Sequence, residues 1–227
     1  MDLSSYQLAI GLTSFVVLLF SLSFHEAAHA WMASRLGDET ARREGRISLN
    51  PLVHIDPVGT LLFPLLQIFT GVALLGWAKP TPYEPRNFDR RHSMRVGHML
   101  VAGAGPLSNL VLALVFTAVL FAIVRSGLAE TPEHPLVMLV AVAVPMNVGL
   151  ALFNLIPIPP LDGSKVASYG LPGRLGDRYD RVMEPYGFLI LLGVCMLPLF
   201  GGRSLMALVL SPFTAWFATL LFRLAGA

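Results

Sequence analysis

The sequence predicts an all-α integral membrane protein with five to six transmembrane helices. Of its 227 residues, 55% are hydrophobic and 13% are charged, whereas a soluble domain carries about 25% charged residues. The apolar residues form runs close to the length of about 20 residues that a helix needs to cross a bilayer. The basic residues are spread over several short loops and the net charge is only +2. This distribution indicates membrane topology rather than a nucleic-acid partner.

The apolar runs give the expected order of elements along the chain. Helices are predicted at residues 6–36, 95–125, 136–156, 184–200 and 204–224, and a further apolar stretch covers residues 57–76. The first run follows the acidic Asp2 and no basic residue, and it continues to Leu36. We therefore expect a retained helix there rather than a cleaved signal peptide. The connecting stretches are short, so residues 1–227 are predicted to form a single polytopic domain.

The stretch 57–76 is predicted to be a re-entrant or extended element between the first helix and the next one. It is barely long enough to span a bilayer, and Pro64 would break or kink a helix. Basic residues flank it on both sides, so a full crossing would place one basic loop outside the cell, against the positive-inside rule. The resulting topology has five crossings, with the N-terminus outside and the C-terminus in the cytoplasm. A sixth crossing is the alternative if this stretch spans the membrane.

The first predicted helix carries the ionisable sequence HEAAH at residues 25–29. His25 and His29 are four residues apart and share one helix face, a spacing at which two imidazoles bind one metal ion. Glu26 lies beside them, where its carboxylate can take a proton from a metal-bound water that attacks a carbonyl. Unpaired ionisable groups at this depth cost several kcal/mol. Ligation is therefore favoured over a purely structural role.

A catalytic zinc site uses three protein ligands and one open position, and Asp162 is the candidate for the third ligand. It lies in NLIPIPPLDG, residues 154–163, where prolines end the preceding helix and stiffen the chain and Gly163 permits a turn. In the predicted topology, Asp162 and the two histidines lie toward the same cytoplasmic face. The chain has one cysteine, Cys195. No intramolecular disulfide can form, so a metal site must use histidine and carboxylate ligands.

HEAAH, GAGPLSN and NLIPIPPLDG resemble the three signature segments of the site-2 protease family of intramembrane zinc metalloproteases. HIDPVGT and GWAKPTPYEP resemble the intervening segments of minimal bacterial-type members without a PDZ domain. The resemblance implies that His25, His29 and Asp162 bind one catalytic Zn2+ ion. It gives Glu26 the role of general base, and Asn154 that of orienting substrate or stabilising the oxyanion. The implied substrate is a membrane-anchored protein cut within or beside its transmembrane helix.

Several further residues have alternative roles. His54 and Asp56 either hydrogen-bond the ligating histidines or brace the re-entrant element. Asn109 is expected mainly to hydrogen-bond between helices beside the site. Pro157 and Gly163 are candidates for supporting the ligands or contacting substrate. GWAKPTPYEP has too many glycine and proline residues for a regular helix, so it either holds an extended substrate by strand addition or covers the site as a loop.

Two other classes of function also use histidines in a membrane protein. A di-iron hydroxylase or desaturase needs many more ligands than the six histidines here provide. A zinc transporter or non-catalytic zinc-binding protein would use the same three ligands, and Glu26 would then be a further ligand or dispensable. The favoured interpretation is a multi-pass zinc metalloendopeptidase of the cell membrane with its active site toward the cytoplasm. Its partners are a membrane-protein substrate and the lipid bilayer, and the oligomeric state is left open.

Overall fold

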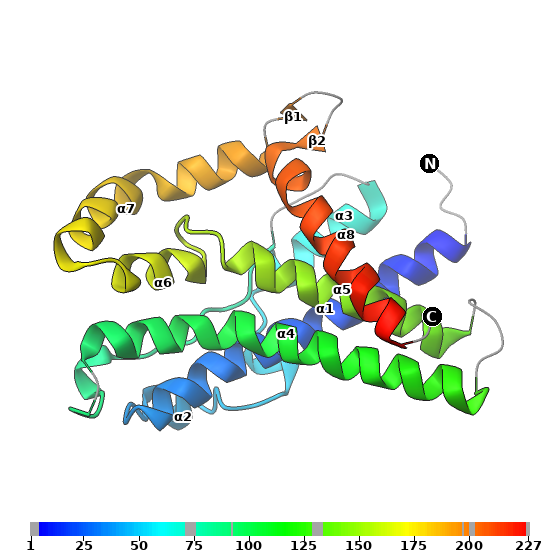
Figure 1. The fold of residues 1–227 in the computed structure, drawn as a ribbon, viewed down its shortest axis with the longest axis horizontal. Helices are drawn as coiled ribbons and strands as arrows, with labels where there is room; N and C mark the ends of the chain where they lie inside the picture. Colours follow the sequence, from blue (N-terminus) through cyan, green and yellow to red (C-terminus); the bar gives the residue numbers. More distant parts are fainter. Residues whose placement is uncertain are drawn as a thin grey trace.

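The computed structural model describes residues 5–70, 76–91, 93–128, 134–196, 198–199 and 203–225. Within these ranges the chain is helical apart from loops and one pair of two-residue strands, which confirms the all-α prediction (Figure 1). The helices are α1 (Ser5–Arg35), α2 (Thr40–Arg43), α3 (Phe63–Thr70), α4 (Met94–Ser126), α5 (Pro135–Asn154), α6 (Asp162–Gly170), α7 (Gly173–Met196) and α8 (Leu205–Ala225). The strands are β1 (Pro198–Leu199) and β2 (Arg203–Ser204), and shorter helical turns are Pro51–Val53, Pro57–Leu62 and Pro85–Asn87.

Helix α4 is the central element and contacts α1, α5, α6 and α8. It begins at a serine cap, where Ser93 Oγ accepts a hydrogen bond from Val96 N at 3.3 Å. It ends before Gly127, whose φ of 66° is the left-handed conformation in which glycine commonly stops a helix. Buried apolar side chains from α4, α5 and α8 form one shared core cluster. The helices α1, α5, α6 and α8 therefore pack around α4.

Three described helices, α1, α4 and α5, are long and apolar enough to cross a membrane. Residues 57–70 and 210–224 form shorter apolar helices. The three candidate crossings confirm a membrane protein, while the total of five to six stays a prediction. Helix α7 begins at Gly173, well before the predicted start at residue 184. Its first turns are amphipathic and charged, a pattern that a search for apolar runs passes over.

The two described ends of the stretch that follows α1 lie side by side. Asp56 caps its helical part, because Asp56 Oδ1 accepts hydrogen bonds from two backbone N–H groups at 3.0 and 2.7 Å. The chain then returns beside its own starting point: Trp77 N donates to Gly59 O at 3.3 Å, and Thr60 Oγ1 donates to Trp77 O at 2.7 Å. These bonds hold together the two described ends of the stretch, on either side of residues 71–75, which lie outside the described residues. The predicted re-entrant course of residues 57–76 through the membrane stays a prediction.

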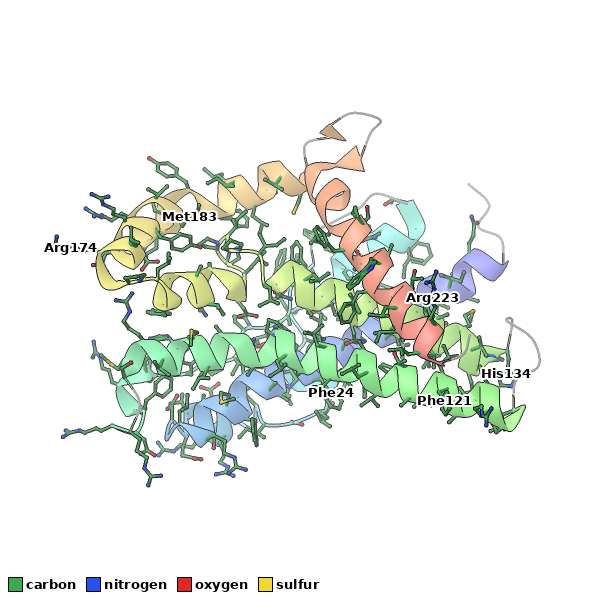
Figure 2. All side chains as sticks on the ribbon, in the orientation of Figure 1. Phe24, Phe121, His134, Arg174, Met183 and Arg223 are labelled. Atoms are coloured by element: carbon green, nitrogen blue, oxygen red, sulfur yellow. The ribbon has the colours of Figure 1, made fainter. Side chains whose placement is uncertain are left out.

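The C-terminal helix runs to the opposite end of the molecule from the one expected. The predicted topology separates the C-terminus from the loop at 126–135. In the structure, Leu221 of α8 belongs to the same core cluster as Ile123 near the end of α4. Figure 2 shows Arg223 toward the same end as His134. Helices α7 and α8 follow one another toward that end instead of forming two opposed crossings (Figure 1). The side of the membrane on which the C-terminus lies stays a prediction.

A buried aspartate joins the end of α1 to the segment that precedes α4. Asp38 is 0% exposed and accepts a hydrogen bond from Thr40 Oγ1 at 2.6 Å within its own turn. It also accepts from Glu84 N at 2.7 Å and from Asn87 Nδ2 at 2.9 Å. Burial raises the pKa of Asp38, but these hydrogen bonds outweigh burial and hold the pKa below its ordinary value.

The substitution Asp38→Asn is expected to destabilise the protein at neutral pH and to remove part of its acid sensitivity. Because the folded-state pKa lies below the unfolded value, the carboxylate stabilises the fold above about pH 4, and this contribution is lost as the pH falls further. An amide offers one acceptor oxygen instead of two, which we expect to cost about 2 kcal/mol. Thermal unfolding in detergent as a function of pH measures both effects. The exposed Asp177→Asn control should not change the curve, and an unchanged curve for Asp38→Asn would contradict this role.

Candidate metal centre and active-site cavity

Two helices bring together a group of three metal-binding side chains. His25 and His29 lie one turn apart on α1, and Asp162 is the first residue of α6. His25 Nε2 and His29 Nε2 lie 3.0 and 3.2 Å from Asp162 Oδ2. The candidate ligand atoms all lie within 4.8 Å of one another, and no second group of this kind occurs in the part of the chain that the structure describes. Burial raises the pKa of Asp162, but the two imidazoles outweigh burial and hold it well below its ordinary value.

Both imidazoles are held through the nitrogen that faces away from Asp162. His29 Nδ1 donates to Val101 O at 2.7 Å, since a backbone carbonyl can only accept. His25 Nδ1 lies 2.7 Å from Asn109 Oδ1, so Asn109 contacts a candidate ligand directly. Outer partners of this kind fix the orientation of a ligating imidazole. Each Nε2 is left to face the carboxylate.

Gly105 on α4 leaves the space that a metal ion needs between the two imidazoles. A Cβ atom at this position would lie 2.6 Å from His25 Nε2 and closer still to His29 Nε2. A zinc ion sits about 2.0–2.1 Å from a ligating imidazole nitrogen, so the missing Cβ would stand almost where the ion belongs. Imidazole nitrogen and carboxylate oxygen are also donors that zinc accepts. The residues present therefore fit a zinc ion.

The segment that carries Asp162 is packed tightly against the end of α5. A Cβ atom at Gly163 would overlap the carbonyl group of Leu155. Gly163 lies in the first turn of α6, so its role is close approach of two backbones and not the turn expected from the sequence. Pro157 O accepts a hydrogen bond from Tyr179 Oη of α7 at 2.8 Å. Pro157 and Gly163 thus hold the segment in place, and their proposed contact with substrate stays a prediction.

Glu26 lies on the same cavity and is held by a residue that the sequence did not single out. Thr81 N and Thr81 Oγ1 donate to Glu26 Oε2 at 2.9 and 2.8 Å. Thr81 belongs to residues 76–84, which form neither helix nor strand, as their glycine and proline content predicted. The sequence pointed toward Thr81 only through the prediction that the segment GWAKPTPYEP lies near the site. The contact itself joins residues 55 positions apart, and local sequence patterns carry no information about such a pair.

Arg46 anchors the segment that presents Thr81. Its side chain is 3% exposed and donates to Val53 O, to Lys79 O at 2.5 Å and to Pro80 O at 2.9 Å. One guanidinium therefore ties the start of the re-entrant element to the chain just before Thr81. Nothing in the local sequence around Arg46 marks it as buried, so its role could not be predicted from the sequence.

The candidate ligands and Glu26 line a cavity of about 360 Å³. Its walls include residues 76–78 and 80–81 of the extended segment and Lys165 of α6. Asn154 also lies on this cavity at the C-terminal end of α5, where its Nδ2 donates to Leu150 O at 3.0 Å. The cavity therefore places the predicted Asn154 on the same space as the candidate metal centre.

His54 and Asp56 lie in the re-entrant element and support its structure. His54 Nε2 bonds to Ser48 O at 2.8 Å, and the His54 carbonyl accepts from Lys79 N at 2.9 Å. Asp56 caps the helix that follows it. The outer nitrogens of the two candidate ligands are bonded instead to Asn109 and Val101. Of the two alternatives for His54 and Asp56, the structure supports bracing and not contact with the ligating histidines.

Comparison with known proteins identifies the family. The model of peptidase family M50 matches residues 13–131 and 121–198, and so includes HEAAH and NLIPIPPLDG. The chain belongs to peptidase family M50. It is 36% identical over 186 residues to YwhC of Bacillus subtilis, which is named as a candidate zinc metalloprotease, and the match covers 81% of this chain and 80% of the relative. It is also 31% identical over 188 residues to Rip2 of Mycolicibacterium smegmatis, with a similar name, covering 79% of this chain and 65% of the relative.

Membership of the M50 family confirms the resemblance to site-2 proteases and makes this protein a metalloprotease of the membrane. No solved structure matches the chain with significance. The family assignment excludes the di-iron hydroxylase. The zinc metalloprotease names of the relatives agree with the site, because α1 and α6 bring together three side chains of a kind that binds zinc.

Proposed function

We propose that this M50 protein is an intramembrane zinc metalloprotease that hydrolyses a peptide bond within or near the transmembrane segment of a membrane-protein substrate. The observation that carries this proposal is the convergence of the three candidate ligands with Glu26 on one cavity. Two imidazoles and one carboxylate supply the three protein ligands of a catalytic zinc site, with a fourth position open. A bound Zn2+ ion would lower the pKa of a water in that position and polarise the scissile carbonyl.

Glu26 is the general base in this proposal. Thr81 N donates to Glu26 Oε2, and the single hydroxyl proton of Thr81 has both Glu26 Oε2 and the Glu26 carbonyl oxygen within reach, at 2.8 and 3.0 Å. These contacts orient the carboxylate, and we propose that Oε1 is the oxygen that transfers the proton. Glu26 Oε1 takes a proton from the attacking water and delivers it to the leaving nitrogen. A base held in position in this way contributes about 10²–10⁴-fold to the rate.

The substrate must present an unwound peptide bond to the cavity. A transmembrane helix satisfies its own carbonyl groups, so it has to open before its peptide bonds can react. Much of the extended segment at residues 76–84 lines the cavity and would contact the opened substrate there. Several of its backbone groups already bond within the protein, so this contact would rest mainly on its side chains. Asn154 would orient the substrate or stabilise the oxyanion from the opposite element, α5.

We place this site toward the cytoplasmic side of the cell membrane. Arg35 ends α1, and Arg42 and Arg43 end α2 directly after it. These residues follow the HEAAH segment, so the end of α1 nearer the site is the basic end. Basic loops stay in the cytoplasm in multi-pass proteins. The same arginine side chains would face the headgroups of the bilayer.

Removal of the metal is expected to stop proteolysis reversibly. Purified protein in detergent should cut a panel of model transmembrane substrates, with faster cutting when the target helix contains proline or glycine. A chelator should abolish cleavage, and added Zn2+ should restore it while Mg2+ should not, because two imidazoles suit zinc and not magnesium. Gel analysis of the products measures the rates. Continued cleavage by metal-free protein would rule out the zinc mechanism.

A further inference from the structure

Behind His25, a buried row of two side-chain amides connects α1, α4 and α5, which lie together at the centre of the fold (Figure 1). Asn109 of α4 and Asn147 of α5 are both 0% exposed. Asn109 Oδ1 lies 2.7 Å from His25 Nδ1, and Asn109 Nδ2 lies 3.0 Å from Asn147 Oδ1. Asn147 Nδ2 lies 2.9 Å from the carbonyl oxygen of Ala143, one turn back on α5. Such groups are costly to bury among apolar helices unless each is paired.

The last partner fixes the direction of every hydrogen bond in this row. A backbone carbonyl can only accept, so the Asn147 atom beside Ala143 O must be the donor Nδ2. Asn147 then turns its acceptor Oδ1 toward α4, so the facing atom of Asn109 must be the donor Nδ2. A second acceptor, Ser21 O, lies 3.4 Å from the same Nδ2. Asn109 Oδ1 is therefore the atom that faces His25, and His25 Nδ1 must carry the proton.

We propose that Asn147 is a positioning residue: acting through Asn109, it fixes the tautomer of His25 that is protonated at Nδ1 and so directs the lone pair of Nε2 into the metal centre. This inference rests on the proposed function, because it takes His25 Nε2 as a zinc ligand. His29 reaches the same state without a relay, since its Nδ1 donates directly to Val101 O.

A relay is needed at His25 because its partner is a side-chain amide. An amide can rotate by half a turn and exchange its donor for its acceptor, whereas a backbone carbonyl cannot. If Asn109 turned in this way, it would present Nδ2 to His25 Nδ1. His25 would then carry its proton on Nε2, which has no lone pair left for a metal ion. Ending the row on Ala143 O removes this freedom.

The test measures the zinc affinity of purified full-length protein in detergent, by competition with a zinc indicator. Asn147→Leu should lower the affinity by about 10–100-fold, the usual cost of losing an outer partner of a ligating histidine. Asn147→Ala removes the same amide without adding volume and should give the same result if the leucine variant folds poorly. Asn109→Asp presents only acceptor oxygens to His25, and it is combined with Asn147→Leu because Asn147 Oδ1 would otherwise face one of these oxygens. The double variant Asn109→Asp/Asn147→Leu should therefore regain most of the affinity lost in Asn147→Leu.

Thr117→Val is the matched control for these variants. Thr117 is also buried on α4 and donates to a carbonyl one turn back, Ala113 O, at 2.8 Å, but it is about two turns beyond Asn109. The zinc affinity of the Thr117→Val variant should equal that of the wild type. The inference would be overturned if Asn147→Leu bound zinc as tightly as the wild type. It would also be overturned if Asn147→Leu lost affinity and the double variant Asn109→Asp/Asn147→Leu did not regain it, because altered packing alone would then explain the loss. A wild type that binds no zinc is a distinct result and contradicts the proposed function itself.

Discussion

The substitution Glu26→Gln is expected to abolish proteolysis while leaving zinc binding intact. Glutamine keeps the size of the side chain and an oxygen that can accept from Thr81 N and Thr81 Oγ1, but it cannot take a proton from water. We expect the rate of peptide hydrolysis to fall by about 10³-fold, within the range that a positioned general base contributes. The measurement combines cleavage of a model transmembrane substrate with quantification of bound zinc in the same preparations.

Glu44→Gln is the control for this substitution, because Glu44 is exposed after α2 and lies outside the cavity lining. It should cut substrate at the rate of the wild type. The alternative of a zinc transporter or a non-catalytic zinc protein makes a different forecast for Glu26→Gln. In that case zinc binding would change, or the wild type and the variant would both leave every substrate intact. Undiminished cleavage by Glu26→Gln would remove Glu26 from the mechanism.

The substitution Gly105→Ala is expected to prevent zinc binding. The added Cβ atom would lie 2.6 Å from His25 Nε2 and even closer to His29 Nε2, nearly in the position that the ion would take. Alanine favours a helix more than glycine does, so α4 itself should form normally. Zinc content should fall from one ion per chain to near zero, and proteolysis should disappear with it.

Gly103→Ala is the matched control on the same helix. Apart from its two chain neighbours and the nearby backbone of α4, no atom of the described residues lies within 4 Å of a Cβ at Gly103, so this alanine should leave zinc content unchanged. The comparison separates a local steric effect from a general change in α4. A Gly105→Ala protein that retains a full complement of zinc would show that the ion does not lie between the two imidazoles beside Gly105.

The parts of the site that follow from local rules could be predicted from the sequence. A spacing of four residues places His25 and His29 on one helix face whatever the rest of the fold does. Pro64 and the basic flanks predicted a re-entrant element at residues 57–76, and the bonds of Trp77 to Gly59 and Thr60 hold its two described ends together. In each case a short stretch of chain contains the whole physical reason.

Other features depend on contacts between distant segments and could not be predicted. Thr81 holds Glu26 from 55 positions away. Gly105 lies against two imidazoles only because α1 packs on α4, and the sequence GAGPLSN does not reveal this contact. Hydropathy alone also misjudged the amphipathic start of α7.

The proposed hydrolysis depends on one Zn2+ ion held by His25, His29 and Asp162 with an open fourth position. The zinc-edge X-ray absorption spectrum of the purified protein tests this ligand set most directly. It should show two imidazole nitrogens at about 2.0–2.1 Å and otherwise only oxygen, from the carboxylate and water. A sulfur ligand at about 2.3 Å, for which Cys195 is the only source in the sequence, or a shell without imidazole would contradict it.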